Sequence, residues 1–247
     1  MTVLAVVSAA LGYEWLGLRA RRWNPWRGAA FAAGCATALA GLGMHTHDTA
    51  GHMGQHLLVA MIAPLGIVLG APVTLLLRTL PVSWARRLSR MLRTRPVGFL
   101  TRPVVALALS AGSLLLLHLT PLFAYAMSNP AVHSALLVHF LLSGCLFAWV
   151  IAGPDPAPHR PGVRTRLIVL AVAIAVHAGL SQLMYAGVLV RTPGTVADRQ
   201  AAATLMYYGG DLAELLLAFA MFQARVPAPP PGADRSHLRG VITSPEG

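Results

Sequence analysis

The chain has 247 residues, of which 56% are hydrophobic and only 11% charged, and its formal net charge is +11. A soluble domain usually carries about 25% charged residues. This composition excludes an ordinary soluble globule, because its surface would be mostly apolar and would aggregate. All 19 basic residues are arginine, which excludes proteins that need a lysine Schiff base, such as a seven-helix retinal protein.

Seven stretches of the chain are apolar enough to cross a bilayer as helices, which takes about 20 residues for a hydrocarbon core about 30 Å thick. They cover residues 2–18, 28–44, 52–77, 103–126, 132–152, 167–190 and 201–223. No arginine precedes Arg19, so the first stretch lacks the positive region of a cleavable signal peptide and is interpreted as a retained span. The predicted fold class is all-α, a polytopic membrane bundle of seven transmembrane helices.

The arginines are divided unequally between alternate loops. Seventeen follow the first, third, fifth or seventh span, and only Arg191 and Arg199 lie in the other loops. Because cytoplasmic loops are enriched in basic residues, we expect the N-terminus outside and the C-terminus in the cytoplasm. The positive charge is therefore a topology signal, and no nucleic acid partner is expected.

Two cytoplasmic segments differ from the spans. In Pro81–Arg95, apolar residues such as Trp84 and Met91 recur at helical spacing between arginines. This pattern is typical of a short helix on the inner leaflet in contact with membrane lipid, and partner binding is the alternative. The tail is rich in Pro and Gly, so we expect a transmembrane domain over residues 1–225 and a disordered cytoplasmic tail over residues 226–247.

With this topology, eight of the ten histidines lie in the outer loops or the outer half of the membrane. These are His45, His47, His52, His56, His118, His133, His139 and His177. Polar side chains at membrane depth are costly and point to function. Several methionines share that side, and imidazole together with thioether suits copper, whereas imidazole alone also suits zinc or iron.

His52 and His56 form the sharpest local motif. Residues four apart lie about 40° apart around a helix, so both rings leave the same face and can clasp one ion. Met53 follows the first histidine, so the general-base Glu of a zinc peptidase is missing. The alternative is that both rings hydrogen-bond to neighbours or headgroups. His45 and His47 would deliver metal from outside, or they are ordinary loop histidines.

The remaining histidines are predicted to lie on separate spans. His133 and His139 are offset by about 120°, so they cannot clasp one ion together from a straight helix. His139 lies about 9 Å deeper and is the better intramembrane ligand, whereas His133 lies near the headgroups. His118 either faces another histidine or caps a neighbouring carbonyl.

Near the middle of the last two spans the sequence places His177 opposite two carboxylates, Asp211 and Glu214. A buried carboxylate needs a partner or a proton. We predict a His177–Asp211 pair across these helices. The pair would orient a metal-ligating ring or act as a purely structural link.

Taken in chain order, these motifs resemble the seven-span CtaG family of cytochrome c oxidase assembly factors. This family is associated with caa-type haem–copper oxidases. It is distinct from the single-span copper chaperone that shares the name. The resemblance runs from about Gly41 to Phe222. It rests on His52–Leu58, Ala63–Pro64, Leu69–Pro72, His118–Phe123, His133–His139, Gly153–Pro156, Asp198–Gln200 and Met206–Asp211. Span seven departs from the family, which usually has Asp and Gln adjacent, a Trp after that Met, and a Glu at Asp211.

The resemblance implies a bacterial cytoplasmic membrane protein that matures cytochrome c oxidase without catalysing bond cleavage, and hence no enzyme. It would take copper from an extracytoplasmic donor and pass it to an oxidase subunit on the outer side, and a homodimer is compatible with the sequence. Cu(I) is expected rather than Cu(II), because a thioether, Met53, joins the candidate ligands. Those ligands are His52, His56, His118, His139, His177 and Asp211, with His45, His47 and His133 as accessory residues. The alternatives are a haem b electron carrier and a metal permease.

Overall fold

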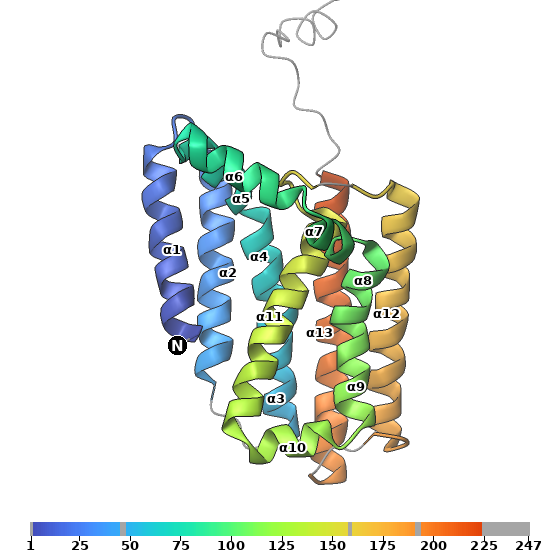
Figure 1. The fold of residues 1–247 in the computed structure, drawn as a ribbon. Helices are drawn as coiled ribbons and strands as arrows, with labels where there is room; N and C mark the ends of the chain where they lie inside the picture. The colour runs from blue at the N-terminus through green and yellow to red at the C-terminus, as the bar shows by residue number, and fades with distance from the viewer. Residues whose placement is uncertain (1, 45–47, 158–159, 191–193, 224–247) are drawn as a thin grey trace, which may run out of the picture.

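The computed structural model describes residues 2–44, 48–157, 160–190 and 194–223. Within these ranges every regular element is a helix, which confirms the all-α prediction. Most helices run side by side in one bundle, and short helices cross its two ends (Figure 1). His45, His47 and the tail predicted to be disordered lie outside the described residues.

The first two helices form an antiparallel pair at one side of the bundle, α1 (Thr2–Arg19) and α2 (Pro25–Gly43). The rings of Tyr13 and Phe31 stack between them with centroids 3.9 Å apart. The Tyr13 hydroxyl also donates a 2.7 Å hydrogen bond to the carbonyl of Gly70. This bond ties α1 to the third rod of the bundle.

The third rod is built from four consecutive elements. They are α3 (Thr49–His56), the π-helical turn η1 (Leu57–Ile62), α4 (Ala63–Leu69) and α5 (Pro72–Thr79). In η1 the chain makes the wider hydrogen bond, from the N–H of Ala63 to the carbonyl of Leu58. Pro64 follows, and it has no N–H to continue the ladder. Such π turns inside helices are often found at functional sites.

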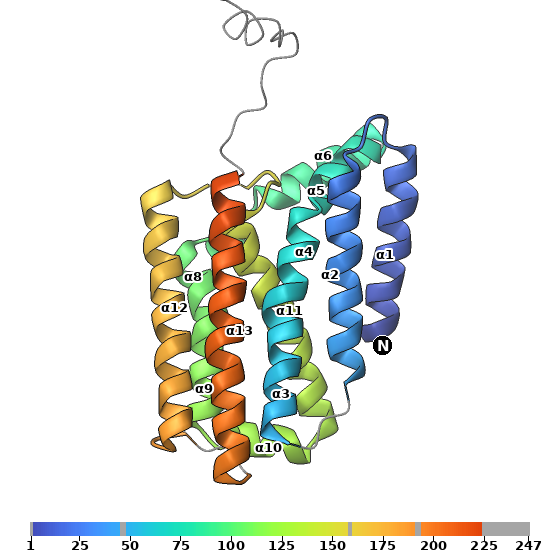
Figure 2. The same ribbon diagram turned by 180° about the vertical axis from the view of Figure 1, so that it is seen from behind.

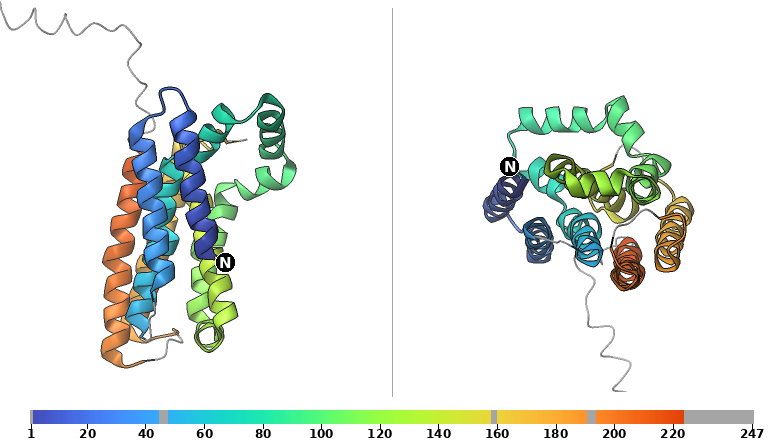
Figure 3. Two further views of the ribbon diagram at one scale, coloured as in Figure 1. Left: turned by 90° about the vertical axis from the view of Figure 1, so that its left-hand side faces the viewer. Right: turned by 90° about the horizontal axis from the view of Figure 1, so that it is seen from below.

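Helices α6 (Val82–Leu92) and α7 (Arg95–Leu100) cross one end of the bundle and project sideways as a shelf (Figure 3, left). Helix α6 confirms the surface helix expected within Pro81–Arg95. It buries none of its residues in the protein, and Trp84 is exposed. That its apolar side rests on lipid stays a prediction.

The fourth rod is bent. It consists of α8 (Pro103–Leu107), a second π turn η2 (Ala108–Gly112) and α9 (Ser113–Leu119). Helix α10 (Leu122–Ser128) then turns by 82° and lies across the end opposite the shelf (Figure 1).

Three long helices complete the bundle. They are α11 (Pro130–Ala152), α12 (Val163–Ala186) and α13 (Val196–Gln223). Helices α12 and α13 lie against each other along their length, and α13 also lies beside α3 and η1 (Figure 2). Seen from below, α2, the third rod, α13 and α12 follow one another along one side of the bundle (Figure 3, right).

Four described segments are long and apolar enough to span a membrane, and the bent fourth rod with α10 makes a fifth. The four are Thr49–Thr79, Pro130–Ala152, Val163–Ala186 and Val196–Gln223. The structure is therefore that of a helical membrane protein with several spans. Helices α1 and α2 are outside this set, so the count of seven spans stays a prediction.

The two ends of the bundle differ in charge. The loop from α1 to α2, the shelf and the start of α12 are rich in arginine, and all three lie at one end (Figure 1). At the other end, marked by α10, Arg199 donates to the carbonyl of Met184 at the end of α12 over 3.1 Å. The described arginines that are expected on one side of the membrane thus lie at one end of the bundle.

Candidate metal centre

Two small cavities lie inside the bundle, and His56 and Phe140 line both. The first, about 50 Å³, is called the histidine cavity and is also lined by His52, His118 and His133. The second, about 40 Å³, is called the glutamate cavity and is also lined by His177 and Glu214. Both are close to the size of one or two water molecules or a metal ion.

In the histidine cavity, imidazoles from three helices line one space, and two of them lie beside the ring of Phe123. The rings of His52 and His133 meet nearly at right angles, with centroids 5.3 Å apart. The ring of Phe123 lies 6.2 Å from that of His52 and 5.3 Å from that of His118. Met53 is part of the same lining. The cavity therefore offers several imidazoles and a thioether on mainly apolar walls.

His118 is the most informative of these side chains, because it is only 1% exposed. Its Nδ1 lies 3.0 Å from the carbonyl of Leu114, so Nδ1 carries the proton and donates it there. Nε2 then holds a lone pair, and it has no hydrogen-bond partner among the residues described. The alternative that His118 caps a neighbouring carbonyl is confirmed, and the ring also belongs to the lining of the histidine cavity.

The motif of His52 and His56 is arranged as the helical spacing predicts, because both side chains line the histidine cavity. His56 packs edge-on against Phe140 with ring centroids 4.8 Å apart. It lies where the two cavities meet.

The two histidines of α11 have different surroundings. His133 meets His52, whereas Nε2 of His139 lies 3.2 Å from the carbonyl of Leu109 in η2. His139 lines neither of the two cavities. Depth along the helix favoured His139 as a ligand, but rotation about the helix brings His133 to the cavity.

The predicted His177–Asp211 pair is wrong, because the partner of His177 is Glu214. Nδ1 of His177 lies 2.9 Å from Oε1 of Glu214 and 3.2 Å from the carbonyl of Ala173. Glu214 is 2% exposed, whereas Asp211 is half-buried. Three residues rotate a helix by about 300°, so only one carboxylate of the two can face α12 squarely.

The ion pair leaves the Glu214 carboxylate with unused acceptor capacity. Neither of its oxygens has a donor in hydrogen-bond geometry within the described part of the chain, although Oε1 is at ion-pair distance from His177. The contact with His177 is therefore the main polar contact that the described residues give this buried carboxylate.

Three methionines lie in the apolar cluster that surrounds the histidine cavity: Met53, Met184 and Met206 are almost completely buried. Thioethers are both adaptable core residues and soft metal ligands. Cys35 and Cys145 are free thiols.

A carboxylate that the site prediction did not include fixes the start of α3. Asp198, at the beginning of α13, accepts hydrogen bonds from the N–H groups of Thr49 at 2.9 Å and Ala50 at 3.1 Å. Asp155 does the same for α5, accepting from Val73 at 3.0 Å and Thr74 at 2.7 Å. The sequence signal was the presence of both carboxylates in the family motifs.

We expect Asp198→Ala to lower the free energy of unfolding by about 1–2 kcal/mol, the usual cost of a lost helix cap. Asp198→Asn should cost clearly less, because one carbonyl oxygen still accepts at the start of α3. Thermal unfolding of the purified protein in detergent measures both variants. Equal stability of the two would contradict the capping role.

The described residues contain no group of three or more His, Cys, Asp or Glu side chains already placed to hold a metal ion. A metal in the histidine cavity would therefore be held by fewer imidazoles with a thioether, or after small side-chain rotations. His118 supplies the orienting hydrogen bond typical of metal-ligating histidines, whose other ring nitrogen is usually fixed by a carbonyl or carboxylate.

Comparison with known proteins agrees with this arrangement of motifs. A family described as the cytochrome c oxidase caa3 assembly factor, CtaG, matches residues 10–226. The chain belongs to this family. An uncharacterized protein of Mycobacterium bovis, Mb0105, is 34% identical over 188 residues, which are 71% of this chain and 28% of the relative. An uncharacterized protein of Mycobacterium leprae, ML1998, is 32% identical over 187 residues, which are 68% of this chain and 28% of that relative.

The chain thus spans less than a third of the length of these mycobacterial relatives. No solved structure matches it.

Proposed function

We propose that this member of the CtaG family binds Cu(I) in the histidine cavity and passes it to a cytochrome c oxidase subunit during assembly. The observation that carries the proposal is the buried Nε2 of His118, which has no hydrogen-bond partner among the described residues and belongs to a cavity that three other imidazoles also line. Burying a polar nitrogen without a partner is costly, and a metal ion would remove that cost.

The donor set fits a soft, weakly coordinated ion. Imidazole nitrogen from His118, His52 and His133, with the thioether of Met53, matches the ligand preference of Cu(I). A site of few ligands also suits cargo, because an incoming ligand from a partner can replace them one at a time. This transfer needs no bond cleavage in the protein, so the proposed role is that of an assembly factor and not an enzyme.

The distribution of charge supports an orientation for the proposed transfer. The arginine-rich end would face the cytoplasm, with the N-terminus outside, in the bacterial cytoplasmic membrane. The end marked by α10, nearest His52, would then face the outside. There the copper donor and the oxidase subunit would meet the protein, and His45 with His47 would take part in delivery.

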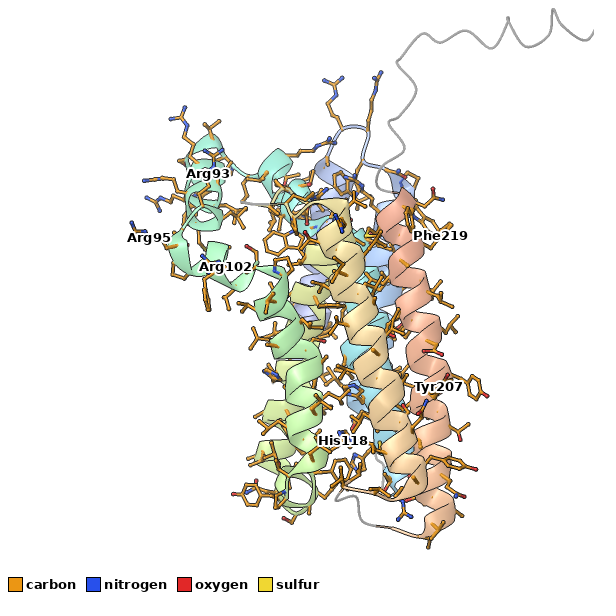
Figure 4. All side chains as sticks on the ribbon, turned by 90° about the vertical axis from the view of Figure 1, so that its right-hand side faces the viewer. Arg93, Arg95, Arg102, His118, Tyr207 and Phe219 are labelled. Atoms are coloured by element: carbon orange, nitrogen blue, oxygen red, sulfur yellow. The ribbon has the colours of Figure 1, made fainter. Side chains whose placement is uncertain are left out.

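Two observations favour copper over the alternatives. The cavities of about 40 and 50 Å³ are far below the 300–1,000 Å³ typical of pockets for larger organic ligands, which argues against haem b. A permease would need ligands at both ends, but Figure 4 shows arginines such as Arg95 at the end away from His118, and these repel a cation.

Copper binding should depend on His118 and not on His139. We expect His118→Leu to weaken Cu(I) binding by at least tenfold, a loss comparable with that of removing a supporting residue at a metal site. His139→Gln removes an imidazole that is bonded to a backbone carbonyl outside the cavity. The Cu(I) affinity of this variant should therefore match that of the unchanged protein. Titration of the reduced, purified protein against a chromophoric Cu(I) chelator measures both.

To check that both variants are folded, their elution profiles and unfolding temperatures are compared. Equal Cu(I) affinity of a folded His118→Leu variant and the unchanged protein would refute the proposed site.

A further inference from the structure

A third cavity lies between the shelf and the bundle, at the end opposite the histidine cavity. It measures about 670 Å³, well within the range of small-molecule sites. Among the described residues its lining contains no carboxylate and four arginines, which are Arg93, Arg95, Arg102 and Arg160. We call it the arginine cavity.

No carboxylate of the described residues neutralises the charges of the three arginines contributed by the shelf and the start of α8. Arg93, Arg95 and Arg102 form no ion pair with any carboxylate of the described residues. Arg160 is held in place, because its guanidinium donates to the backbone carbonyls of Gly153 and Asp155. Planar guanidinium groups recognise phosphate by paired hydrogen bonds. The arginine cavity is therefore suited to a ligand that carries a phosphate group.

The surroundings of the arginine cavity favour a lipid as the source of that phosphate. Its lining includes Pro103, the first residue of α8, and α8 starts the bent membrane span. Val104, next to the arginines, is 70% exposed, and Phe99 and Leu100 are also exposed. Figure 4 shows Arg93, Arg95 and Arg102 along the shelf and its junction with α8. A headgroup can reach the arginines from here while its acyl chains lie along α8.

We propose that the arginine cavity binds the phosphate headgroup of an anionic phospholipid. Basic pockets at the cytoplasmic ends of membrane helices are suited to such headgroups. Bound lipid would join the shelf to the bundle, because its phosphate contacts arginines from α7, from the start of α8 and from the segment before α12. This site is separate from the proposed copper site and does not depend on it.

The test is native mass spectrometry of the full chain in detergent, titrated with phosphatidylglycerol, phosphatidylcholine or inorganic phosphate. We expect the unchanged protein to retain one phosphatidylglycerol preferentially. Arg95→Gln/Arg102→Gln should reduce its apparent affinity about tenfold. The matched control Arg86→Gln/Arg90→Gln removes the same charge from exposed positions on α6 that do not line the cavity, so it should bind as before.

Three results would overturn the proposal. An equal loss of phosphatidylglycerol affinity in both double variants would show that the lipid is attracted to the basic surface as a whole. Equal retention of phosphatidylcholine would remove the preference for an anionic lipid. Inorganic phosphate that displaces phosphatidylglycerol at matched concentration would identify a site for free phosphate.

Discussion

Gly34→Val should abolish the recovery of folded protein, because Gly34 lies where the backbones of α2 and α4 touch. A Cβ atom added there would lie 2.5 Å from the backbone nitrogen of Ile67 and 2.8 Å from the carbonyl oxygen of Ala63. Overpacking a core usually costs about 1–3 kcal/mol, but here rigid backbone must move. We therefore expect a loss above about 4 kcal/mol, at the extreme of single substitutions. The yield of monodisperse protein in detergent measures it.

Gly43→Val on the same helix is the matched control, since an added Cβ at Gly43 meets no atom within 4 Å. It should give folded protein in nearly normal yield. A similar yield for both variants would mean that the close approach of α2 and α4 is not required. Small residues at such contacts are typical of packed membrane helices, so the control separates packing from the general cost of valine in place of glycine.

Most of the fold could be predicted from the sequence, because a bilayer leaves a chain few ways to satisfy its backbone. Length and hydropathy located the rods, and the surface helix α6 followed from arginines between apolar residues. The π turns η1 and η2 and the 82° bend into α10 could not be predicted. They depend on how prolines such as Pro64 and Pro121 are accommodated by neighbouring helices.

The sequence could predict which residue types form the candidate site, but not which of their side chains contact each other. Spacing within one helix placed His52 and His56 correctly on a shared face. Contacts between helices depend on how each helix is rotated about its own axis. Residue spacing within one helix does not predict that rotation. His133 rather than His139 therefore meets His52, and Glu214 rather than Asp211 meets His177. The capping role of Asp198 could not be predicted, because the helix start that it caps lies almost 150 residues away along the chain.

His177→Leu should destabilise the protein strongly because it leaves Glu214 buried without its ionic partner. The imidazole and the carboxylate are 2.9 Å apart, and Glu214 is 2% exposed. Breaking a buried pair from one side typically costs about 3–5 kcal/mol, whereas replacing both partners by apolar residues is often close to neutral. We therefore expect His177→Leu/Glu214→Leu to recover most of the stability lost in the single variant, measured by thermal unfolding in detergent.

Asp211→Asn, three residues before Glu214 on α13, is the control for this pair. Asp211 is half-buried and is not the partner of His177, so its replacement should change stability by no more than about 0.5 kcal/mol. If the double variant were as unstable as the sum of the single variants, the two side chains would be energetically independent. The ion pair would then contribute nothing to the stability of the bundle, and the glutamate cavity would have to be held together by its apolar walls alone.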